Sequence, residues 1–488
     1  MKRRDLVRGV AVAAGASFVK GAFPVRALAQ LASGAAAPLA VEIGYDRPGN
    51  TLPANFTGLG YEISSVARKG LLEPHNRVYV EMVRALGRSG VIRVGGNTSD
   101  FSRFAPGGPA VSSPRGTVVT TADLRDLGGF LQATGWQLIW GLNLGSERSP
   151  ENLANALDQA EAVARFAGSR LLAIEIGNEP DLFGIEHRPK PYPYDNFRRE
   201  FEPVRDALLK RLPNVPLAGP DVAGATAWVE RFAADEKPNL RLLTHHYYRE
   251  GQSPRSTSAK LLETDPNLTR TLAELSAASK TSGLPFRLCE VNSFSGGGRP
   301  GVSDTFTQAL WVLDYMLRIA AGGGAGVNIE TGVNQLGFIS SYSPIADDEH
   351  DRYTAAPGFY GMLAFAQIGD GRLLPVTLGP GTLGPGTLNV AAYAVERTTG
   401  ETVLIAINRE TTTRGSLRVP QRPGTRASVL RLEAPTLSAT RGVSLGGIPV
   451  SMSGTWHAPP WKPVTAEAEA FAIDLPAASA VLVRLARG

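Results

Sequence analysis

Between residues 51 and 367 the sequence alternates short apolar runs with longer amphipathic stretches. Short apolar runs bounded by turn-forming residues are typical of buried strands, and the stretches between them have the spacing of helices that cover a sheet. Eight runs have the length and composition of strands, at residues 56–64, 91–97, 136–145, 171–179, 215–222, 242–248, 286–292 and 326–332. Eight β/α units of this kind close into a (β/α)8 TIM barrel, which is the α/β fold we predict.

An open, doubly wound parallel sheet is the alternative arrangement of the same units. Nucleotide-binding sheets of that type carry a glycine-rich, phosphate-binding turn after the first strand. The segment that follows residues 56–64 lacks this fingerprint, which favours the barrel.

The texture of the sequence changes after residue 368. Short alternating runs separated by glycine and proline turns occur at residues 389–397, 401–410, 415–420, 426–433 and 479–487. Runs of this kind are typical of a C-terminal antiparallel β-sandwich. Residues 40–50 form a strand-like piece before the barrel, and we expect it to pair with the sandwich. The predicted domains are therefore a barrel at 51–367 and a sandwich made of 38–50 together with 368–488.

The first 29 residues contain the parts of an export signal. Adjacent Arg3 and Arg4 precede a weakly apolar stretch that ends at an Ala-Leu-Ala sequence, which fits a signal-peptidase cleavage site. We predict a twin-arginine signal at residues 1–29 and a periplasmic or secreted bacterial protein, with a basic, disordered N-terminus as the alternative. No other segment is long and apolar enough to span a bilayer, so we expect no stable membrane association once the signal is removed.

The charge balance gives no support for a polyanionic partner. The predicted signal holds six basic residues and one acidic residue, a net charge of +5, which equals the formal charge of the whole chain. The mature protein is therefore formally neutral, and no global field steers an anion toward it. We predict no nucleic-acid partner.

Two glutamates, Glu179 and Glu290, each end an apolar run at the point where a strand becomes a polar loop. A parallel barrel brings the C-terminal ends of its strands to one face, so acids far apart in sequence meet there. Hydrolysis of a glycosidic bond needs such a pair of carboxyl groups. We assign Glu179 as the acid/base and Glu290 as the nucleophile. Separations of about 5–5.5 Å and about 6.5–9.5 Å distinguish retention from inversion of the anomeric configuration.

Other polar residues near these strand ends have both a functional and a structural interpretation. Glu175 has the same strand parity as Glu179, and we interpret it as a structural acid inside the barrel rather than a reactant. Cys289 adjoins Glu290, but strand alternation is expected to point it away from the glutamate, as a buried and inert thiol. In the run THHYY (244–248), either His245 and Tyr247 or the alternate pair faces the site. No metal-binding spacing of histidines is present, so we predict neither a catalytic metal nor another cofactor.

Several segments together resemble the heparanase and β-glucuronidase family, glycoside hydrolase family 79. They are LGYE (59–62), IRVGGNTSD (92–100), IEIGNEP (174–180), THHYY (244–248), CEVNSFSGGG (289–298), VSDTF (302–306) and SSYSPI (340–345). The resemblance covers the barrel and, more loosely, the sandwich. It implies a retaining mechanism with Glu179 as acid/base and Glu290 as nucleophile. It also implies a sugar pocket lined by Glu62, Asn178, His245, Tyr247, Gly296, Gly297 and Tyr342.

Two positions depart from the family pattern at the sugar pocket. Ser295 replaces a tyrosine that family members usually carry before the glycine triplet, and Ser340 and Ser341 replace glycines before Tyr342. The leading hypothesis is an exo-β-glucuronidase that releases terminal glucuronic acid from a carbohydrate substrate. A β-glucosidase or diglycosidase, or a heparanase-like endo-β-glucuronidase, are the alternatives on the same scaffold. A catalytically dead carbohydrate-binding protein is the non-enzyme alternative.

Overall fold

The computed structural model describes residues 38–333, 340–347, 350, 352–379 and 388–487. The predicted export signal at residues 1–29 lies outside these described residues. Among the described helices, none has the length and apolar character that crossing a membrane requires.

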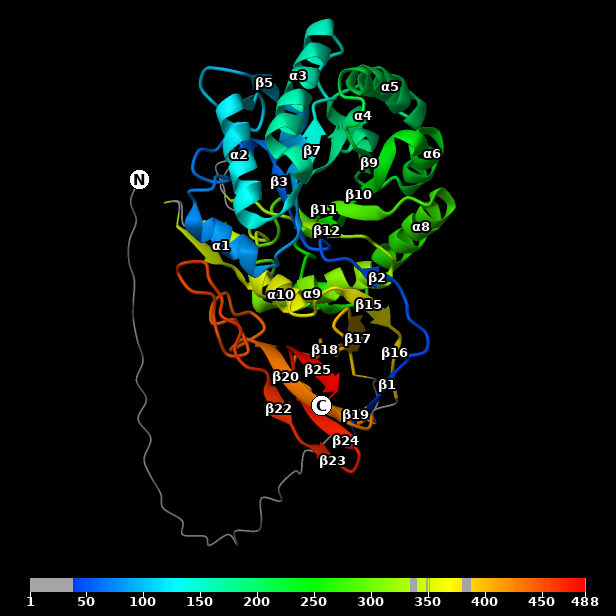
Figure 1. Ribbon diagram of the computed structural model, residues 1–488, viewed down its shortest axis with the longest axis vertical. Helices are drawn as coiled ribbons and strands as arrows, with labels where there is room; N and C mark the ends of the chain where they lie inside the picture. Colours follow the sequence, from blue (N-terminus) through cyan, green and yellow to red (C-terminus); the bar gives the residue numbers. More distant parts are fainter. Residues whose placement is uncertain (1–37, 334–339, 348–349, 351, 380–387, 488) are drawn as a thin grey trace, which may run out of the picture. The chain divides into compact units, whose positions relative to one another are not determined.

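A closed barrel of eight parallel strands forms the larger part of the fold (Figure 1). Its strands, in the order in which they neighbour one another, are β3 (Gly58–Glu62), β4 (Val91–Gly95), β7 (Gln137–Leu142), β8 (Leu171–Ile176), β9 (Leu217–Val222), β10 (Leu240–Gly251), β11 (Phe286–Ser295) and β12 (Val327–Glu330). Each of the eight expected runs contributes one strand, which confirms the predicted TIM barrel.

Helices connect and cover the barrel strands. They are α1 (Arg77–Ala85), α2 (Thr121–Thr134), α3 (Pro150–Ala167), α4 (Phe183–Glu186), α5 (Tyr194–Arg211), α6 (Thr226–Glu236), α7 (Ser258–Leu262), α8 (Pro266–Ser282), α9 (Phe306–Ala321) and α10 (Pro357–Ala366). Local sequence sets their starts, because side-chain oxygens of Thr120, Ser149 and Asp265 accept hydrogen bonds from the first turns of α2, α3 and α8. Two small two-stranded sheets lie in the loops that connect these elements. They are β5 (Arg103–Ala105) with β6 (Val118–Thr120), and β13 (Ile345–Asp347) with β14 (Tyr353–Ala355).

Two sheets form the C-terminal sandwich. The first contains β16 (Val376–Leu378), β1 (Leu39–Ile43), β19 (Gly415–Pro420), β24 (Ala470–Leu475) and β23 (Ala466–Glu467). The second contains β2 (Thr51–Leu52), β15 (Gly371–Leu374), β17 (Val390–Arg397), β18 (Thr402–Asn408), β25 (Ser479–Arg487), β20 (Thr425–Glu433) and β21 (Ser444–Leu445), with β22 (Lys462–Val464) paired to β20. The N-terminal β1 pairs with β16 and β19, so both ends of the described chain belong to the sandwich.

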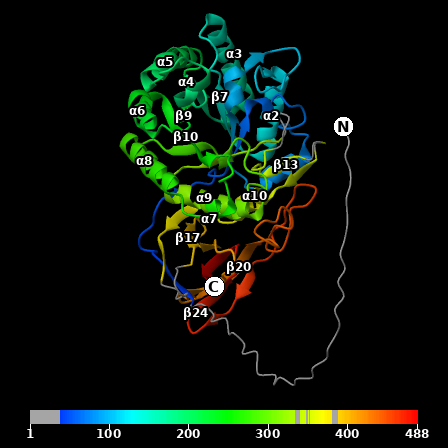
Figure 2. The same cartoon turned by 180° about the vertical axis from the view of Figure 1, so that it is seen from behind.

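The sandwich packs against the barrel through helices α9 and α10, which lie between the two in both views (Figures 1 and 2). Both faces of strand β25 are buried, which explains why its sequence is apolar without interruption. Val481 and Val483 pack into the core between the two sheets, whereas Ala480 and Leu482 on the opposite face join the barrel core. The Tyr393 hydroxyl also donates a 2.7 Å hydrogen bond to Asp314 on α9. Through these contacts the sandwich buttresses the barrel.

Candidate active site

A cavity of about 540 Å³ opens at the C-terminal ends of the barrel strands. Its wall consists of Glu62, Asn97, Glu179, Leu182, Ala223, Tyr248, Glu250, Gly251, Glu290, Ser295, Gly296, Gly297, Glu330, Gly332, Ser340 and Tyr342. Six residues assigned from the sequence, Glu62, Glu179, Glu290, Gly296, Gly297 and Tyr342, therefore lie around one cavity. Five of the lining side chains are glutamates and none is lysine or arginine, among the residues that the structure describes.

Tyr248 and His246 occupy the places that the resemblance gave to Tyr247 and His245. Alternation along β10 sets this, because Leu242 packs inside the barrel and every second side chain after it follows. Tyr247 instead points outward and donates a 2.8 Å hydrogen bond to Asp265 at the start of α8. His245 is buried on the same outer side, and burial lowers its pKa to about 4. The placement of His245 and Tyr247 in the pocket is therefore wrong, because Tyr248 lines the cavity and His246 lies buried behind it against Glu179.

Glu179 stands on a constrained turn after β8. Its backbone is left-handed, with φ of 47°, and its N–H donates a 2.9 Å hydrogen bond to the carbonyl of Asp221, which is also left-handed at φ of 59°. Residues other than glycine tolerate this conformation at an energetic cost, and such positions concentrate at functional sites. The turn fixes the direction in which the carboxyl group enters the cavity.

His246 connects the Glu179 carboxyl to a second acid. One ring nitrogen, Nδ1, lies 3.0 Å from Glu179 Oε1, and Nε2 lies 2.7 Å from Asp221 Oδ1. Burial alone lowers the pKa of His246, but the charges of Asp221 and Glu290 outweigh it and raise the pKa well above its usual value. We therefore describe His246 as an imidazolium that donates to both carboxyl groups.

Glu290 has both oxygens held. The Tyr248 hydroxyl donates to Oε1 at 3.0 Å, and Arg93 Nη1 donates to Oε2 at 2.7 Å. Arg93 is fully buried inside the barrel, so its charge acts on Glu290 with little screening by water. The arrangement fixes the orientation of the Glu290 carboxyl group and places a positive charge beside it.

The two strand-end glutamates approach each other closely. One oxygen of Glu179, one nitrogen of His246 and one oxygen of Glu290 all lie within 4.8 Å of one another. Burial raises the pKa of the Glu179 carboxyl, hydrogen bonding to His246 lowers it, and the charge of Glu290 raises it further, for a net rise. The site thus places a carboxyl group with a raised pKa beside a carboxylate that is ion-paired with Arg93.

Arg93 is the organising cation, and the sequence analysis did not single it out. Besides Glu290, it donates to Glu175 Oε2 at 3.2 Å, Asn178 Oδ1 at 2.8 Å and Asp221 Oδ2 at 2.5 Å. Glu175 is completely buried, as expected of a structural acid. Gly95 makes room for the guanidinium group, because a Cβ there would lie 2.6 Å from Arg93 Cζ. The signal in the sequence is an arginine in the middle of an apolar strand.

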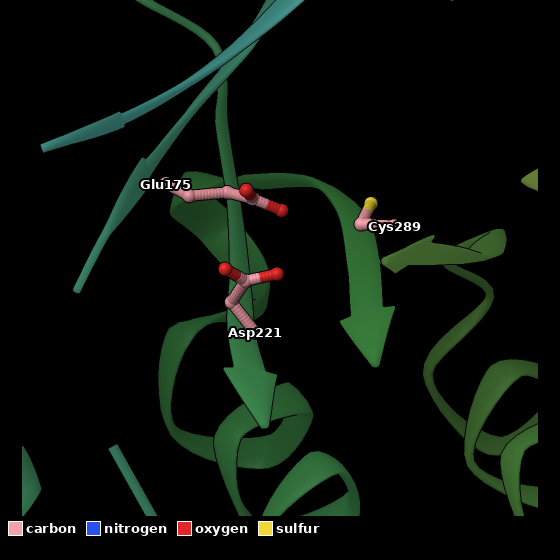
Figure 3. A group of neighbouring side chains, drawn as sticks. All are labelled: Glu175, Asp221 and Cys289. Atoms are coloured by element: carbon pink, nitrogen blue, oxygen red, sulfur yellow. The ribbon is translucent and has the colours of Figure 1, made fainter. Parts of the chain in front are cut away.

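Cys289 does not alternate away from Glu290 as expected. The pairing of β10 with β11 shifts register between His245 and His246, and this irregularity lets the adjacent Cys289 and Glu290 both face the inside of the barrel. Figure 3 shows its thiol with the carboxyl groups of Glu175 and Asp221, and their nearest ligand atoms lie within 4.8 Å. Burial raises the pKa of the thiol well above its usual value, which keeps it protonated and inert.

The acidic cluster in Figure 3 already has cationic partners in the described structure. Arg93 pairs with both Glu175 and Asp221, and His246 pairs with Asp221. These contacts account for the clustering of acids without any further ion. That the site works without a metal remains a prediction.

Asn178 lies one layer beneath the cavity wall. Its side chain accepts from Arg93 and donates to Asn97 Oδ1 at 3.2 Å, and it is Asn97 that reaches the cavity. Asp100 holds this layer in place by accepting hydrogen bonds from the N–H groups of Leu144, Gly145 and Asn178. Asn178 therefore positions its neighbours in this structure.

The floor of the cavity carries two more carboxyl groups, Glu62 and Glu330. Glu62 accepts hydrogen bonds from the N–H and hydroxyl groups of Thr98, and burial with the charge of Glu290 raises its pKa to about 7. Gly96, with φ of 70°, leaves the space that the Glu62 carboxyl fills. Glu330, at the end of β12, was missed in the sequence, although it ends a predicted strand as Glu179 and Glu290 do.

Comparisons with known proteins agree with this geometry. No protein-family model matches the chain. The chain is 26% identical over 331 residues to a β-glucuronidase of Aspergillus niger, covering 61% of this chain and 60% of that protein. It is 27% identical over 315 residues to a β-glucuronidase of Neurospora crassa, covering 56% and 55% respectively. The chain thus spans less than two thirds of the length of either curated relative.

Solved structures share the fold over almost the whole chain. A 4-O-α-L-rhamnosyl-β-D-glucuronidase from Fusarium oxysporum superposes with a TM-score of 0.74 at 18% identity, covering 91% of this chain and 99% of that one. A family 51 α-L-arabinofuranosidase from Bifidobacterium longum superposes with a TM-score of 0.68 at 14% identity, covering 92% and 100%. The barrel with its sandwich is a fold that glycoside hydrolases use.

Proposed function

We propose that this protein is a retaining exo-β-glucuronidase of the heparanase and β-glucuronidase type, which releases terminal glucuronic acid from glycosides or oligosaccharides. One observation carries the proposal. The carboxyl groups of Glu179 and Glu290 approach within 4.8 Å at the C-terminal face of a TIM barrel. A nearest approach of this size is closer to the separation of about 5–5.5 Å typical of retaining enzymes than to the about 6.5–9.5 Å typical of inverting ones.

The contacts divide the chemistry between the two acids. Glu290, oriented by Arg93 and Tyr248, attacks the anomeric carbon and forms a covalent glycosyl-enzyme. Glu179 gives its proton to the leaving oxygen and then removes a proton from water, which attacks the intermediate. Because Glu290 loses its negative charge when the intermediate forms, the pKa of Glu179 falls at the step where it must act as a base.

The sugar assignment rests on the sequence relatives and on the far wall of the cavity. Both curated relatives are named β-glucuronidases. Ser295, Ser340 and Tyr342 supply hydroxyl groups to the cavity, and Gly296 and Gly297 expose backbone to it. Hydroxyl and amide donors of this kind bind a sugar carboxylate without a basic residue. We further propose that residues 1–29 direct export of the protein.

A β-glucosidase is the second candidate, and the charge of the cavity favours it. The described lining has five glutamates and no basic side chain, which is a poor match for an anionic sugar if all five are ionised. The two functions separate in one assay, the release of p-nitrophenol from matched β-D-glucuronide and β-D-glucoside. Faster cleavage of the glucuronide supports the proposal, and cleavage of the glucoside alone contradicts it. Proton NMR of the first product formed must show the β-anomer if the mechanism is retaining.

Replacing Glu179 with alanine should impair leaving groups in proportion to their need for a proton. We expect kcat/KM for an alkyl β-glucuronide to fall about 10²- to 10⁴-fold, the usual contribution of general acid catalysis. An aryl glucuronide with an acidic phenol should form the intermediate almost normally and then accumulate it, because deglycosylation lacks its base. Azide, which needs no base, should restore turnover and yield a β-glycosyl azide. An equal loss for both leaving groups, with no azide product, would assign the acid to another residue.

A further inference from the structure

Glu330 is a buried carboxyl group at the floor of the cavity that the catalytic roles leave unused. Only 4% of its surface is exposed, and it is one of the residues that line the cavity. Its Oε2 is buried without a hydrogen-bond partner in the described structure. Gly60 on the neighbouring β3 leaves the space for this oxygen, because a Cβ there would lie 2.6 Å from it. An unpartnered buried oxygen at the wall of a cavity indicates a contact that a ligand completes.

The position of β12 in the barrel decides which part of a sugar Glu330 meets. In the strand order, β12 and β8 are separated by three strands on either side, so they stand opposite each other. Glu179, which follows β8, marks the side of the leaving group. Glu330 therefore faces the end of the bound sugar that is remote from the scissile bond. In a pyranose bound by its anomeric carbon, that end consists of C4 and its neighbours C3 and C5, so it includes the substituent on C5.

The groups that face Glu330 are mostly acids. Its acidic neighbours are Glu62 on β3 and Glu290 on β11, and the cations are Arg93 on β4 and His246 on β10. The phenols that interact with it are Tyr61, Tyr248 and Tyr342. Both cations already have carboxylate partners, since Arg93 pairs with Glu175, Asp221 and Glu290, and His246 pairs with Asp221 and Glu179. Arg287, another interior arginine, donates to backbone carbonyl groups at the other end of the barrel.

This balance leaves more carboxyl groups than positive charges. Glu62, Glu175, Glu179, Asp221, Glu290 and Glu330 surround two cations, Arg93 and His246. A buried carboxyl group without a partner cation takes up a proton rather than remain charged. Burial, followed by the charges of Glu290 and Glu62, raises the pKa of Glu330 well above its usual value. When protonated, its carboxyl group can donate a hydrogen bond.

We propose that Glu330 is a specificity-determining residue, whose protonated carboxyl group donates a hydrogen bond to the carboxylate on C5 of a bound uronic acid. This assignment rests on the proposed glucuronidase function and explains how a cavity without basic side chains accepts an anionic sugar. Ionisation of Glu330 would place two carboxylates against each other. Binding of the glucuronide therefore requires the proton, whereas binding of a glucoside, which carries a neutral hydroxymethyl group on C5, does not.

The test compares matched p-nitrophenyl β-D-glucuronide and β-D-glucoside across the pH range in which the enzyme is stable. The informative quantity is kcat/KM for the glucuronide divided by kcat/KM for the glucoside, because ionisation of Glu179 and Glu290 affects both substrates and cancels from this ratio. We expect the ratio for the wild type to fall as the pH rises, through an increase in KM for the glucuronide. Glu330→Gln cannot ionise and keeps an N–H donor, so its ratio should no longer depend on pH. Glu330→Ala should lower the ratio about 10- to 100-fold, the effect of losing a hydrogen bond to a charged group.

Controls separate this inference from the function on which it rests. Glu230→Ala, at an exposed position on α6, should leave the ratio and its pH dependence unchanged, and thermal unfolding of each variant shows whether it is folded. A wild type that cleaves the glucoside but no glucuronide overturns both the function and the inference. If the wild type cleaves the glucuronide but its ratio does not change with pH, the inference alone is overturned. The same holds if Glu330→Ala has the same ratio as the wild type. Equal losses for both sugars in Glu330→Ala would also overturn it, because the contact would then be to a hydroxyl group that both share.

Discussion

Glu290→Gln should abolish turnover while the protein stays folded. We expect kcat for p-nitrophenyl β-D-glucuronide to fall by about 10⁴-fold or more, the order of loss seen when an enzyme's nucleophile is removed. The amide is nearly isosteric, its oxygen can still accept from Arg93, and its NH2 group can donate to the Tyr248 hydroxyl oxygen, so the cavity should keep its shape. Steady-state kinetics measure the loss, and binding of glucuronate to the variant by calorimetry shows that the site is intact.

A trapping experiment ties this loss to the covalent step. A 2-deoxy-2-fluoro-β-glucuronyl fluoride should label the wild type once, and peptide mass spectrometry should place the label on Glu290. The Glu290→Gln variant should remain unlabelled, whereas Glu230→Gln, altered at an exposed glutamate, should be labelled and active like the wild type. Label on another carboxyl group would reassign the nucleophile. Full activity in Glu290→Gln would instead point to a mechanism without this residue.

Arg93→Met should be strongly destabilising. The substitution removes the partner of three buried carboxylates, Glu175, Asp221 and Glu290, and methionine fills much of the volume without replacing the charge. Breaking a buried ion pair from one side costs on the order of 3–5 kcal/mol in the free energy of unfolding. Urea unfolding should therefore show a much lower midpoint, and turnover should fall because Glu290 loses its orientation.

The matched control is Arg414→Met on the sandwich. Arg414 donates to both oxygens of Asp474 at 2.9 Å, but the two side chains are 72% and 50% exposed. Exposed pairs of this kind contribute about 0–1 kcal/mol, so the midpoint should hardly change. The double variant Arg93→Met, Glu290→Gln should recover part of the lost stability, because it removes one uncompensated charge. Similar midpoints for Arg93→Met and the wild type would mean that the interior acids are neutral without the arginine.

Protonation of the interior acids gives Arg93→Met a characteristic pH dependence. Burial and the charge of Asp221 raise the pKa of Glu175 to about 7 in the intact protein, where Arg93 opposes the rise. Without Arg93 the pKa should rise further, since a positive charge that favoured ionisation is gone. When the pKa of a carboxyl group is higher in the folded state than in the unfolded state, the group stabilises the fold at pH values below its unfolded-state pKa. That contribution is lost as the pH rises through the folded-state pKa. The difference in the free energy of unfolding between Arg93→Met and the wild type should thus become smaller as the pH falls.

The strand runs carried enough information to predict the barrel, because burial on both faces of a parallel sheet demands uninterrupted apolar residues at each strand. The same logic located Glu179 and Glu290, since a carboxyl group at the end of such a run must lie at the C-terminal face. Glu330 obeys the same rule, and it could have been found from its place in the eighth run. The strand-like piece at 40–50 was expected to join the sandwich, and β1 pairs there with β16 and β19.

Local sequence did not decide on which face of a strand each side chain lies. In the run THHYY, alternation allows either pair to face the cavity, and only the packing of Leu242 into the barrel selects His246 and Tyr248. The register shift between β10 and β11 likewise let Cys289, beside Glu175 and Asp221, and the adjacent Glu290 both face inward. A shift of one residue changes the face on which a side chain lies, and it depends on neighbouring strands.

The sequence by itself determined the architecture and the two acids at the centre of the proposed reaction, because apolar periodicity and strand-end position are local properties. Only the tertiary structure decided which charges compensate which. Arg93, His246 and Asp221 come from strands β4, β10 and β9, yet Arg93 and His246 bond both to the site's glutamates and to Asp221. Protonation of Glu179 and Glu330 depends on that meeting, because the pKa of a buried carboxyl group reflects its desolvation and the charges around it. These are contacts between strands, and no single segment of the sequence contains them.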